Sequence, residues 1–207
     1  MIKQLVFKDM MLQRKLGVTY LICLFFLAVV DFRSDSFLMT VSLSIPVLGM
    51  MLSMNYENKN KSERLVNSLP LQRKEIVIAK YIFASILVAL GGALPFTISL
   101  IQLQNENTTV FMLWAAILGG ITGGLVYTMI VLPIEFTVGY SSAKQIAPFA
   151  GIAFGYLSGL IVSNLWLDVE NVWNTSLVVN ICFIAGLILL YVMSMFFSIH
   201  LYNERDL

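Results

Sequence analysis

Few residues in this 207-residue chain are of types that could carry out chemistry, and those few stand alone. The single histidine, His200, has no second metal ligand beside it, and Cys23 and Cys182 lie in separate apolar runs where neither a disulfide nor a thiolate metal site is expected. The sequence contains no H-E-x-x-H, no G-x-S-x-G and no G-x-x-x-x-G-K-[ST] phosphate-binding loop. We therefore expect no catalytic residues, no metal site and no cofactor bound by this chain, which is not an enzyme.

Glu135 is the one carboxylate that lies within an apolar segment. An ionisable residue inside a membrane helix is costly, and by default it is a candidate for function. Counted from Val110 at 1.5 Å per residue, Glu135 lies about 37 Å along its helix, whereas the hydrocarbon core of a bilayer is about 30 Å thick. We expect this carboxylate at the level of the lipid headgroups, either exposed there or paired with Lys144.

The composition indicates which kind of element must position these residues. Apolar residues make up 58% of the chain and charged residues only 12%, against roughly 25% charged residues in an average soluble domain. The chain is thus predicted to be an integral membrane protein rather than a nucleic-acid-binding one. Because lipid offers no partner to an exposed backbone group, the spans must be helices. We predict an all-α, polytopic protein that forms one transmembrane domain over residues 1–207. Its six spans are expected at Gly17 to Val30, Phe37 to Met54, Ile76 to Leu103, Val110 to Gly139, Ile146 to Leu167 and Leu177 to Leu201.

The basic residues predict the orientation of these spans. Of the 13 Lys and Arg residues, only Arg33 falls on one side of the membrane in this topology. The other basic residues fall in the N-terminal segment, the second and fourth loops, the start of the third span and the C-terminal tail. Because basic residues concentrate in cytoplasmic loops, we expect a multi-pass protein of the cell membrane with both termini in the cytoplasm.

The N-terminal segment, residues 1–16, has a pattern of its own. Apolar residues such as Leu5 and Leu12 recur at helical spacing, while lysines and an arginine occupy much of the rest. This pattern predicts an amphipathic helix in the cytoplasmic interface, with its apolar side toward the membrane lipids and its lysines near anionic headgroups. The alternative is a leader whose charge only sets the topology.

A charged loop of about 20 residues separates the second and third spans. A connection alone needs only about 4–6 residues. Residues 56–67 are compatible with a short helix, and Pro70 then disfavours helix at Leu69 and suits the first turn of the next helix. We expect a short helix, a break and a long membrane helix, with a solvated positive loop as the alternative.

The order of these parts resembles that of the small bacterial ABC-2 type permeases, the membrane subunits of ATP-binding cassette exporters. A basic amphipathic helix and two spans are followed by a loop with the pattern E-R-L-x-x-S-L-P-x-x-R-x-x-I-V-x-x-K and then by four more spans. The segment from Leu132 to Lys144 also resembles a Pro-x-x-x-x-x-Gly segment of that family. In this chain the loop pattern is carried by Glu63, Arg64, Leu65, Ser68, Leu69, Pro70, Arg73, Ile76, Val77 and Lys80.

The resemblance implies a mechanism. In such permeases the loop after the second span, here residues 55–75, forms a coupling helix that sits in a groove of a separate ATPase subunit. That subunit would bind the ATP and magnesium, since this chain has no phosphate-binding loop. A second permease copy or a paralogous permease would complete the exporter, with an amphipathic peptide, antibiotic or lipid-like molecule as cargo. The residues expected to contact the ATPase are Glu57, Glu63, Arg64, Leu65, Ser68, Leu69, Pro70 and Arg73.

Glycines spaced four residues apart predict close contacts between helices, because small residues allow two backbones to approach. They could pack within one six-helix bundle or form the seam of a permease dimer. They lie in the fourth and fifth predicted spans and comprise Gly119, Gly120, Gly123, Gly124, Gly151, Gly155 and Gly159.

Two other functions remain open at this point. A secondary transporter would be expected to bind its substrate and coupling ion near the membrane midplane through polar groups and broken helices. The predicted spans are poor in such groups, which favours an external energy source. An accessory or immunity membrane protein without ATP coupling is the other alternative.

Overall fold

The structure is a computed structural model of the 207-residue chain, and it describes residues 2–31, 37–60, 72–102, 110–139, 145–146, 148–149 and 177–204. The elements within this part are all α-helices, as the composition predicts. In chain order they are α1 (Ile2–Asp31), α2 (Phe37–Lys59), α4 (Arg73–Gln102), α5 (Val110–Val138) and α7 (Leu177–Glu204).

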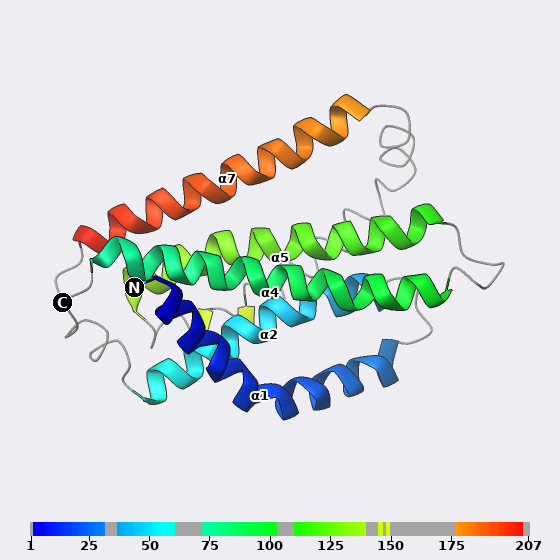
Figure 1. The fold of residues 1–207 in the computed structure, drawn as a ribbon, viewed down its shortest axis with the longest axis horizontal. Helices are drawn as coiled ribbons and strands as arrows, with labels where there is room; N and C mark the ends of the chain where they lie inside the picture. Colours follow the sequence, from blue (N-terminus) through cyan, green and yellow to red (C-terminus); the bar gives the residue numbers. More distant parts are fainter. Residues whose placement is uncertain are drawn as a thin grey trace.

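The helices form a bundle with three central members. Helices α2, α4 and α5 pack against one another, α7 packs on α4 and α5, and α1 packs on α2 and α4 (Figure 1). The start of α1, the ends of α2 and α7 and the start of α4 lie at the left of Figure 1. We call this the loop end of the bundle, because residues 61–71 connect α2 to α4 there.

Three of the described helices are long and apolar enough to cross a membrane. They lie at Arg73–Thr97, Ile117–Val138 and Ile181–Glu204, and they overlap the third, fourth and sixth spans that the sequence predicts. Helices α1 and α2 form over the first two predicted spans, but the side chains of 18–21 and 23–31 in α1 and of 37–39 in α2 are not among those described. The predicted fifth span, 146–167, lies almost entirely outside the described residues. The prediction of six spans is thus supported at three places.

The first helix differs from the prediction. We expected an interfacial helix over residues 1–16 followed by a separate span, but α1 is one helix from Ile2 to Asp31. No proline interrupts it, and its ribbon changes direction only after its first part (Figure 1). Val6 and Asp9 on its first part are buried in the bundle, and the Gln13 amide donates to the carbonyl oxygen of Gly49 in α2, at 3.0 Å. This part of α1 therefore belongs to the helix bundle.

A proline and two glycines bring α2, α4 and α5 into close contact. A Cβ atom added to Gly91 of α4 would lie 2.6 Å from the carbonyl oxygen of Ser42 and 3.0 Å from Pro46 Cδ, both in α2. One added to Gly124 of α5 would lie 2.9 Å from Pro46 Cγ. The three helices thus meet at Pro46, where only a hydrogen atom fits on the facing residue.

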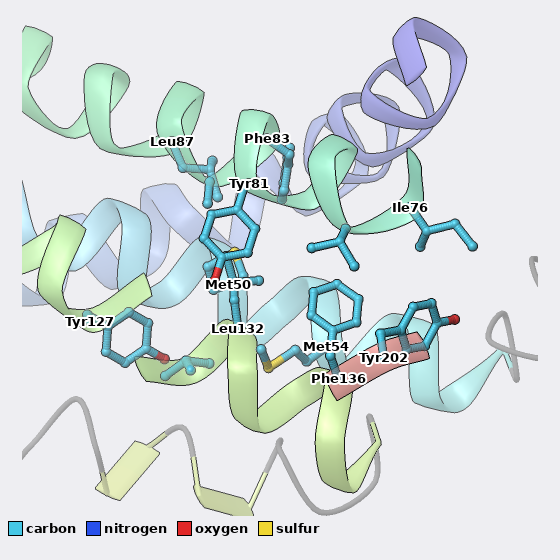
Figure 2. Close-up of a cluster of buried hydrophobic side chains, with 13 residues drawn as sticks. Met50, Met54, Ile76, Tyr81, Phe83, Leu87, Tyr127, Leu132, Phe136 and Tyr202 are labelled. Carbon is cyan, nitrogen blue, oxygen red and sulfur yellow. The ribbon is translucent and has the colours of Figure 1, made fainter. Parts of the chain in front are cut away.

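The apolar core fills the bundle between this contact and the loop end. Side chains from α2, α4, α5 and α7 interdigitate there (Figure 2). Tyr81 and Tyr127 are its largest fully buried side chains, and the centres of the Phe136 and Tyr202 rings are 5.1 Å apart between α5 and α7. The core consists of Met50, Met54, Ile76, Val77, Tyr81, Phe83, Ala84, Leu87, Tyr127, Val131, Leu132, Phe136 and Tyr202.

Candidate functional site

A cluster of charged side chains lies at the loop end of the bundle, and Lys80 of α4 is at its centre. The Lys80 side chain is 4% exposed, and its Nζ atom lies near carboxylates from three other helices. Glu57 Oε2 of α2 is 2.5 Å away, Glu135 Oε1 of α5 is 3.7 Å away, and Asp9 Oδ2 of α1 is 3.9 Å away. One ammonium group thus connects four helices.

Lys8 of α1 supplies the second cation of this cluster. Its Nζ atom lies 3.0 Å from Asp9 Oδ1 and 3.2 Å from Glu57 Oε1. With 43% of its side chain exposed, Lys8 lies at the rim of the cluster, whereas the three carboxylate side chains are nearly inaccessible. Glu57 of α2 is therefore paired with two cations, Lys8 of α1 and Lys80 of α4.

The charge cluster consists of Lys8, Asp9, Glu57, Lys80 and Glu135, and it holds three carboxylates and two ammonium groups. Taking a charge out of water costs several kcal/mol unless a partner and hydrogen bonds compensate it. The ammonium groups of Lys8 and Lys80 supply this compensation, so removing either cation would leave buried negative charge behind. The arrangement offers no nucleophile beside a base. Its chemistry is therefore electrostatic attachment between helices.

Glu135 occupies the least compensated position in the charge cluster. The residue is 1% exposed, and within the described part of the chain neither of its carboxylate oxygens makes a hydrogen bond. Its ion pair with Lys80, at 3.7 Å, is longer than a hydrogen bond. The predicted exposure of this carboxylate is wrong, because Glu135 is buried in the bundle and paired with Lys80. Its level in the bilayer stays a prediction, and Lys144, the partner that the sequence suggests, lies outside the described residues.

On each of the three central helices, the same number of residues separates the contact at Pro46 from the charge cluster. Residues 46 and 57, 91 and 80, and 124 and 135 differ by 11 positions each, and 11 residues make almost exactly three helical turns. The charged residue of each helix therefore lies on the same face as its residue at the Pro46 contact. Close packing at Pro46, Gly91 and Gly124 directs Glu57, Lys80 and Glu135 toward one another three turns away.

Arg73, the first residue of α4, attaches the loop end to the end of α7. Its Nη1 atom donates hydrogen bonds to the carbonyl oxygens of Tyr202 and Asn203, both at 3.0 Å, and its guanidinium lies 5.8 Å from the centre of the Tyr202 ring. The last carbonyls of a helix have no partner within that helix, and a cation favours the negative end of its dipole. Arg73 thus caps α7.

Hydroxyl groups attach α7 along its length. The Tyr81 hydroxyl lies 2.8 Å from the hydroxyls of both Ser194 and Ser198. Tyr191 donates to the carbonyl oxygen of Tyr81, and Ser194 donates to that of Met129, each at 2.8 Å. The opposite face of α7 is exposed and apolar. On its packed side this helix is therefore held to the bundle by polar contacts in addition to the apolar packing of residues such as Tyr202.

The residues predicted to contact an ATPase divide into two groups. The structure brings Glu57 and Arg73 to the loop end, but their side chains bind other helices of the same chain, and Glu57 is 3% exposed. The prediction of Glu57 as an external contact is therefore corrected: its carboxylate faces inward. The other predicted contacts lie outside the described residues and stay a prediction; they are Glu63, Arg64, Leu65, Ser68, Leu69 and Pro70.

The predicted glycines also fall into two groups. Gly124 packs on Pro46, and a Cβ atom added to Gly123 would lie 3.0 Å from Leu43 Cδ1, so this part of α5 packs within the chain. Gly119 and Gly120 lie on the same helix, one turn earlier. Gly151, Gly155 and Gly159 lie outside the described residues. Of the two alternatives for these glycines, the contacts of Gly123 and Gly124 support packing inside one bundle.

Asp9 and Lys80 are functional candidates that the sequence did not single out. In the sequence, Lys80 counts only among the basic residues and the loop pattern, and Asp9 falls among the charges of the N-terminal segment. The 11-residue spacing on α4 and α5 is the signal that could have paired Lys80 with Glu135. The described residues contain no group of three His, Cys, Asp or Glu residues that could hold a metal ion, and the exposed His200 pairs with Glu204 at 3.3 Å.

Long apolar helices with charges gathered at one end define this molecule as a helical, multi-pass membrane protein. The family model described as ABC-2 family transporter protein matches residues 4–203. The chain therefore belongs to the ABC-2 transporter family, whose members are membrane transport components. No curated protein and no solved structure shows a significant match to this chain.

Proposed function

We propose that this chain is the permease subunit of an ATP-driven exporter of the ABC-2 type. The observation that carries the proposal is the family match over residues 4–203, a stretch that contains no phosphate-binding loop. ATP and magnesium are then bound by a separate ATP-binding cassette subunit. A second copy of the permease, or a paralogous permease, completes the membrane pathway.

The loop end of the bundle is the proposed docking side for the ATPase. It is the end at which α2 ends and α4 begins, on either side of residues 61–71 in the sequence, and it carries the exposed Lys59 and Lys74 side chains. The count of basic residues favours the cytoplasm for this end, as for both termini. Charged residues in the connecting loop, Glu63 and Arg64 above all, provide register and specificity toward the partner.

The cargo class follows from the composition of the pathway. The spans carry few polar groups outside the charge cluster and the hydroxyl contacts of α7. An amphipathic peptide, an antibiotic or a lipid-like molecule suits such a pathway better than a sugar or an ion does. The cargo would enter it from the bilayer or from the cytoplasm.

Co-purification with a candidate ATPase tests the proposal. The permease and an ATP-binding cassette ATPase of the same genome are co-expressed, and the tagged permease is isolated in detergent and reconstituted in lipid. The wild-type permease is expected to retain the ATPase and to alter its rate of ATP hydrolysis. Glu63→Arg together with Arg64→Glu should abolish retention while the permease remains in the membrane, because the swap places like charges at the dock.

A swap on the opposite side of the membrane provides the matched control. Arg33→Asp together with Asp35→Arg also conserves net charge, but in the predicted topology it lies in the first outer loop, so the ATPase should stay bound. Retention of the ATPase by the Glu63/Arg64 swap at wild-type stoichiometry would exclude this loop as the dock. Transport by the permease without any ATPase would favour a secondary transporter.

A further inference from the structure

The proposed docking loop, residues 55–75, includes the end of α2 and the start of α4, and a buried ion pair joins these two helices inside the bundle. Glu57 lies two residues before the end of α2, and Lys80 lies seven residues after the start of α4. Their side chains form the closest ion pair of the charge cluster, at 2.5 Å. Since both side chains are buried, water and salt screen this pair far less than a surface pair. A displacement of the loop therefore acts on Lys80 through both helices.

Lys80 also connects this loop to helices that lie outside it in sequence. Its ammonium group is 3.7 Å from Glu135 of α5 and 3.9 Å from Asp9 of α1. Lys8 of α1 in turn contacts Glu57. The apolar core offers contacts that slide or repack with little preference, whereas an ion pair in this low-dielectric interior depends steeply on distance.

The distances around Lys80 define two alternative partners. At present Lys80 donates a hydrogen bond to Glu57, and neither oxygen of Glu135 accepts a hydrogen bond from the described residues. A movement of about 1 Å would bring the ammonium group within hydrogen-bond distance of Glu135. Two packed arrangements separated by so small a shift are the kind of bistable element that switching transitions use.

We propose that Lys80 is the positioning residue that transmits movement of the docking loop to α5, by transferring its hydrogen bond from Glu57 to Glu135. The inference rests on the proposed function, because it needs an ATPase to move the loop. Asp9 connects α1 to Lys80 and Lys8 connects it to Glu57, so α1 follows. Lys80, the ion-pair partner of Glu135, thus acts in coupling.

The decisive variant removes the transmission and conserves the charge balance. Lys80→Met together with Glu135→Met leaves two carboxylates and one ammonium group in the charge cluster, the same net charge as three carboxylates and two ammonium groups. Replacing a buried ion pair by apolar side chains of similar size is often neutral for stability. Lys80→Arg retains a cation at this position. Tyr191→Phe is the matched control, since it removes a part-buried hydrogen bond between α7 and α4 outside the charge cluster.

The experiment measures movement of α5 without needing a known cargo. Spin labels are attached to Val138→Cys at the end of α5 and to Ile181→Cys near the start of α7, away from the docking loop. Both positions are exposed, and the chain lacks Cys23 and Cys182. The complex with the ATPase is compared in its apo form and after trapping with ATP and vanadate. Trapping should shift the label distance in the unsubstituted cluster, in Lys80→Arg and in Tyr191→Phe. In the Lys80/Glu135 double variant the shift should be lost while the ATPase stays bound and hydrolyses ATP.

The outcomes separate the two proposals. If the labelled permease with an unsubstituted cluster does not bind the ATPase, the proposed function fails and the inference with it. If the double variant binds the ATPase and shows an unchanged shift, only the role of Lys80 is overturned. Loss of ATPase binding in the double variant would also overturn that role, because Lys80 would then maintain the dock itself.

Discussion

Gly91→Ala should destabilise the bundle, because the added methyl group has no room on α4. The Cβ atom would lie 2.6 Å from the carbonyl oxygen of Ser42 and 3.0 Å from Pro46 Cδ. The first neighbour is backbone, so it cannot turn away as a flexible side chain would. A carbon and a carbonyl oxygen ordinarily approach no closer than about 3.3 Å, so α2 must move away by about 0.7 Å.

The expected cost is the balance of two effects. Overpacking a well-packed interior costs about 1–3 kcal/mol, whereas replacing Gly by Ala within a helix gains about 0.5–1 kcal/mol. The difference between these ranges is a net loss of about 0–2.5 kcal/mol, and because the clash is with backbone we expect the upper part of it, about 1–2 kcal/mol. For a chain of this size, that corresponds to a decrease of about 2–8 °C in the melting temperature.

Gly186→Ala on α7 is the matched control, since an added Cβ atom there meets no other atom within 4 Å. It carries the same helix-forming gain without the clash, so its melting temperature should equal or exceed that of the wild type. Both variants can be heated in detergent as fluorescent fusions, and the folded fraction measured by size-exclusion chromatography. Equal melting temperatures for Gly91→Ala and Gly186→Ala would refute the close contact of α4 with α2.

The buried polar contacts give three further predictions, all measured by the same thermal assay. Lys80→Met alone should cost about 3–5 kcal/mol, because it leaves buried carboxylates without their main partner, whereas adding Glu135→Met should recover most of that loss; equal melting of the single and double variants would contradict the ion pair. Arg73→Ala should cost about 1–2 kcal/mol through the lost cap of α7, with partial recovery in Arg73→Lys; no loss would mean that water replaces the cap. Tyr81→Phe should cost about 1 kcal/mol, since hydrogen bonds between membrane helices average about 0.6 and reach about 1.7 kcal/mol, and an unchanged melting temperature would show that Ser194 finds another partner.

The sequence predicts which segments become helices, because apolar length and the chemistry of lipid leave little choice. It also predicts that Glu135 is a candidate for function. Counting residues locates Glu135 along the axis of α5, but it does not tell which side of the helix faces the bundle. That depends on the partner helices, and the structure shows Lys80 of α4 as the partner. The length of an apolar segment does not show how the helix is rotated about its own axis.

Asp9 and the continuity of α1 illustrate a second reason why part of the structure could not be predicted from the sequence. The charges of the N-terminal segment indicate an interface, and a helix there can lie on the membrane or pack on neighbouring helices. Asp9 shows that one side of this helix packs on its neighbours, since it is 2% exposed and lies within reach of Lys8 and Lys80. The placement of this segment in the interface stays a prediction. Of the two partners of Asp9, Lys8 is adjacent to it in the sequence and Lys80 is 71 positions away from it. Neither helical periodicity nor the charge count could therefore identify the buried side of α1.

The common 11-residue spacing on α2, α4 and α5 connects packing with charge. At 1.5 Å per residue, the contact at Pro46 and the ion pair of Glu57 with Lys80 are about 16 Å apart along the helices. Pro46 touches both Gly91 and Gly124, so it is the place where the three helices can least separate. A tilt of one helix by about 4° about this contact therefore changes the distances at the charge cluster by about 1 Å. That is the difference between an ion pair at 3.7 Å and a hydrogen bond for Glu135. Tight packing at one level thus makes the charges at the other level sensitive to small tilts, which is the property a coupling element requires.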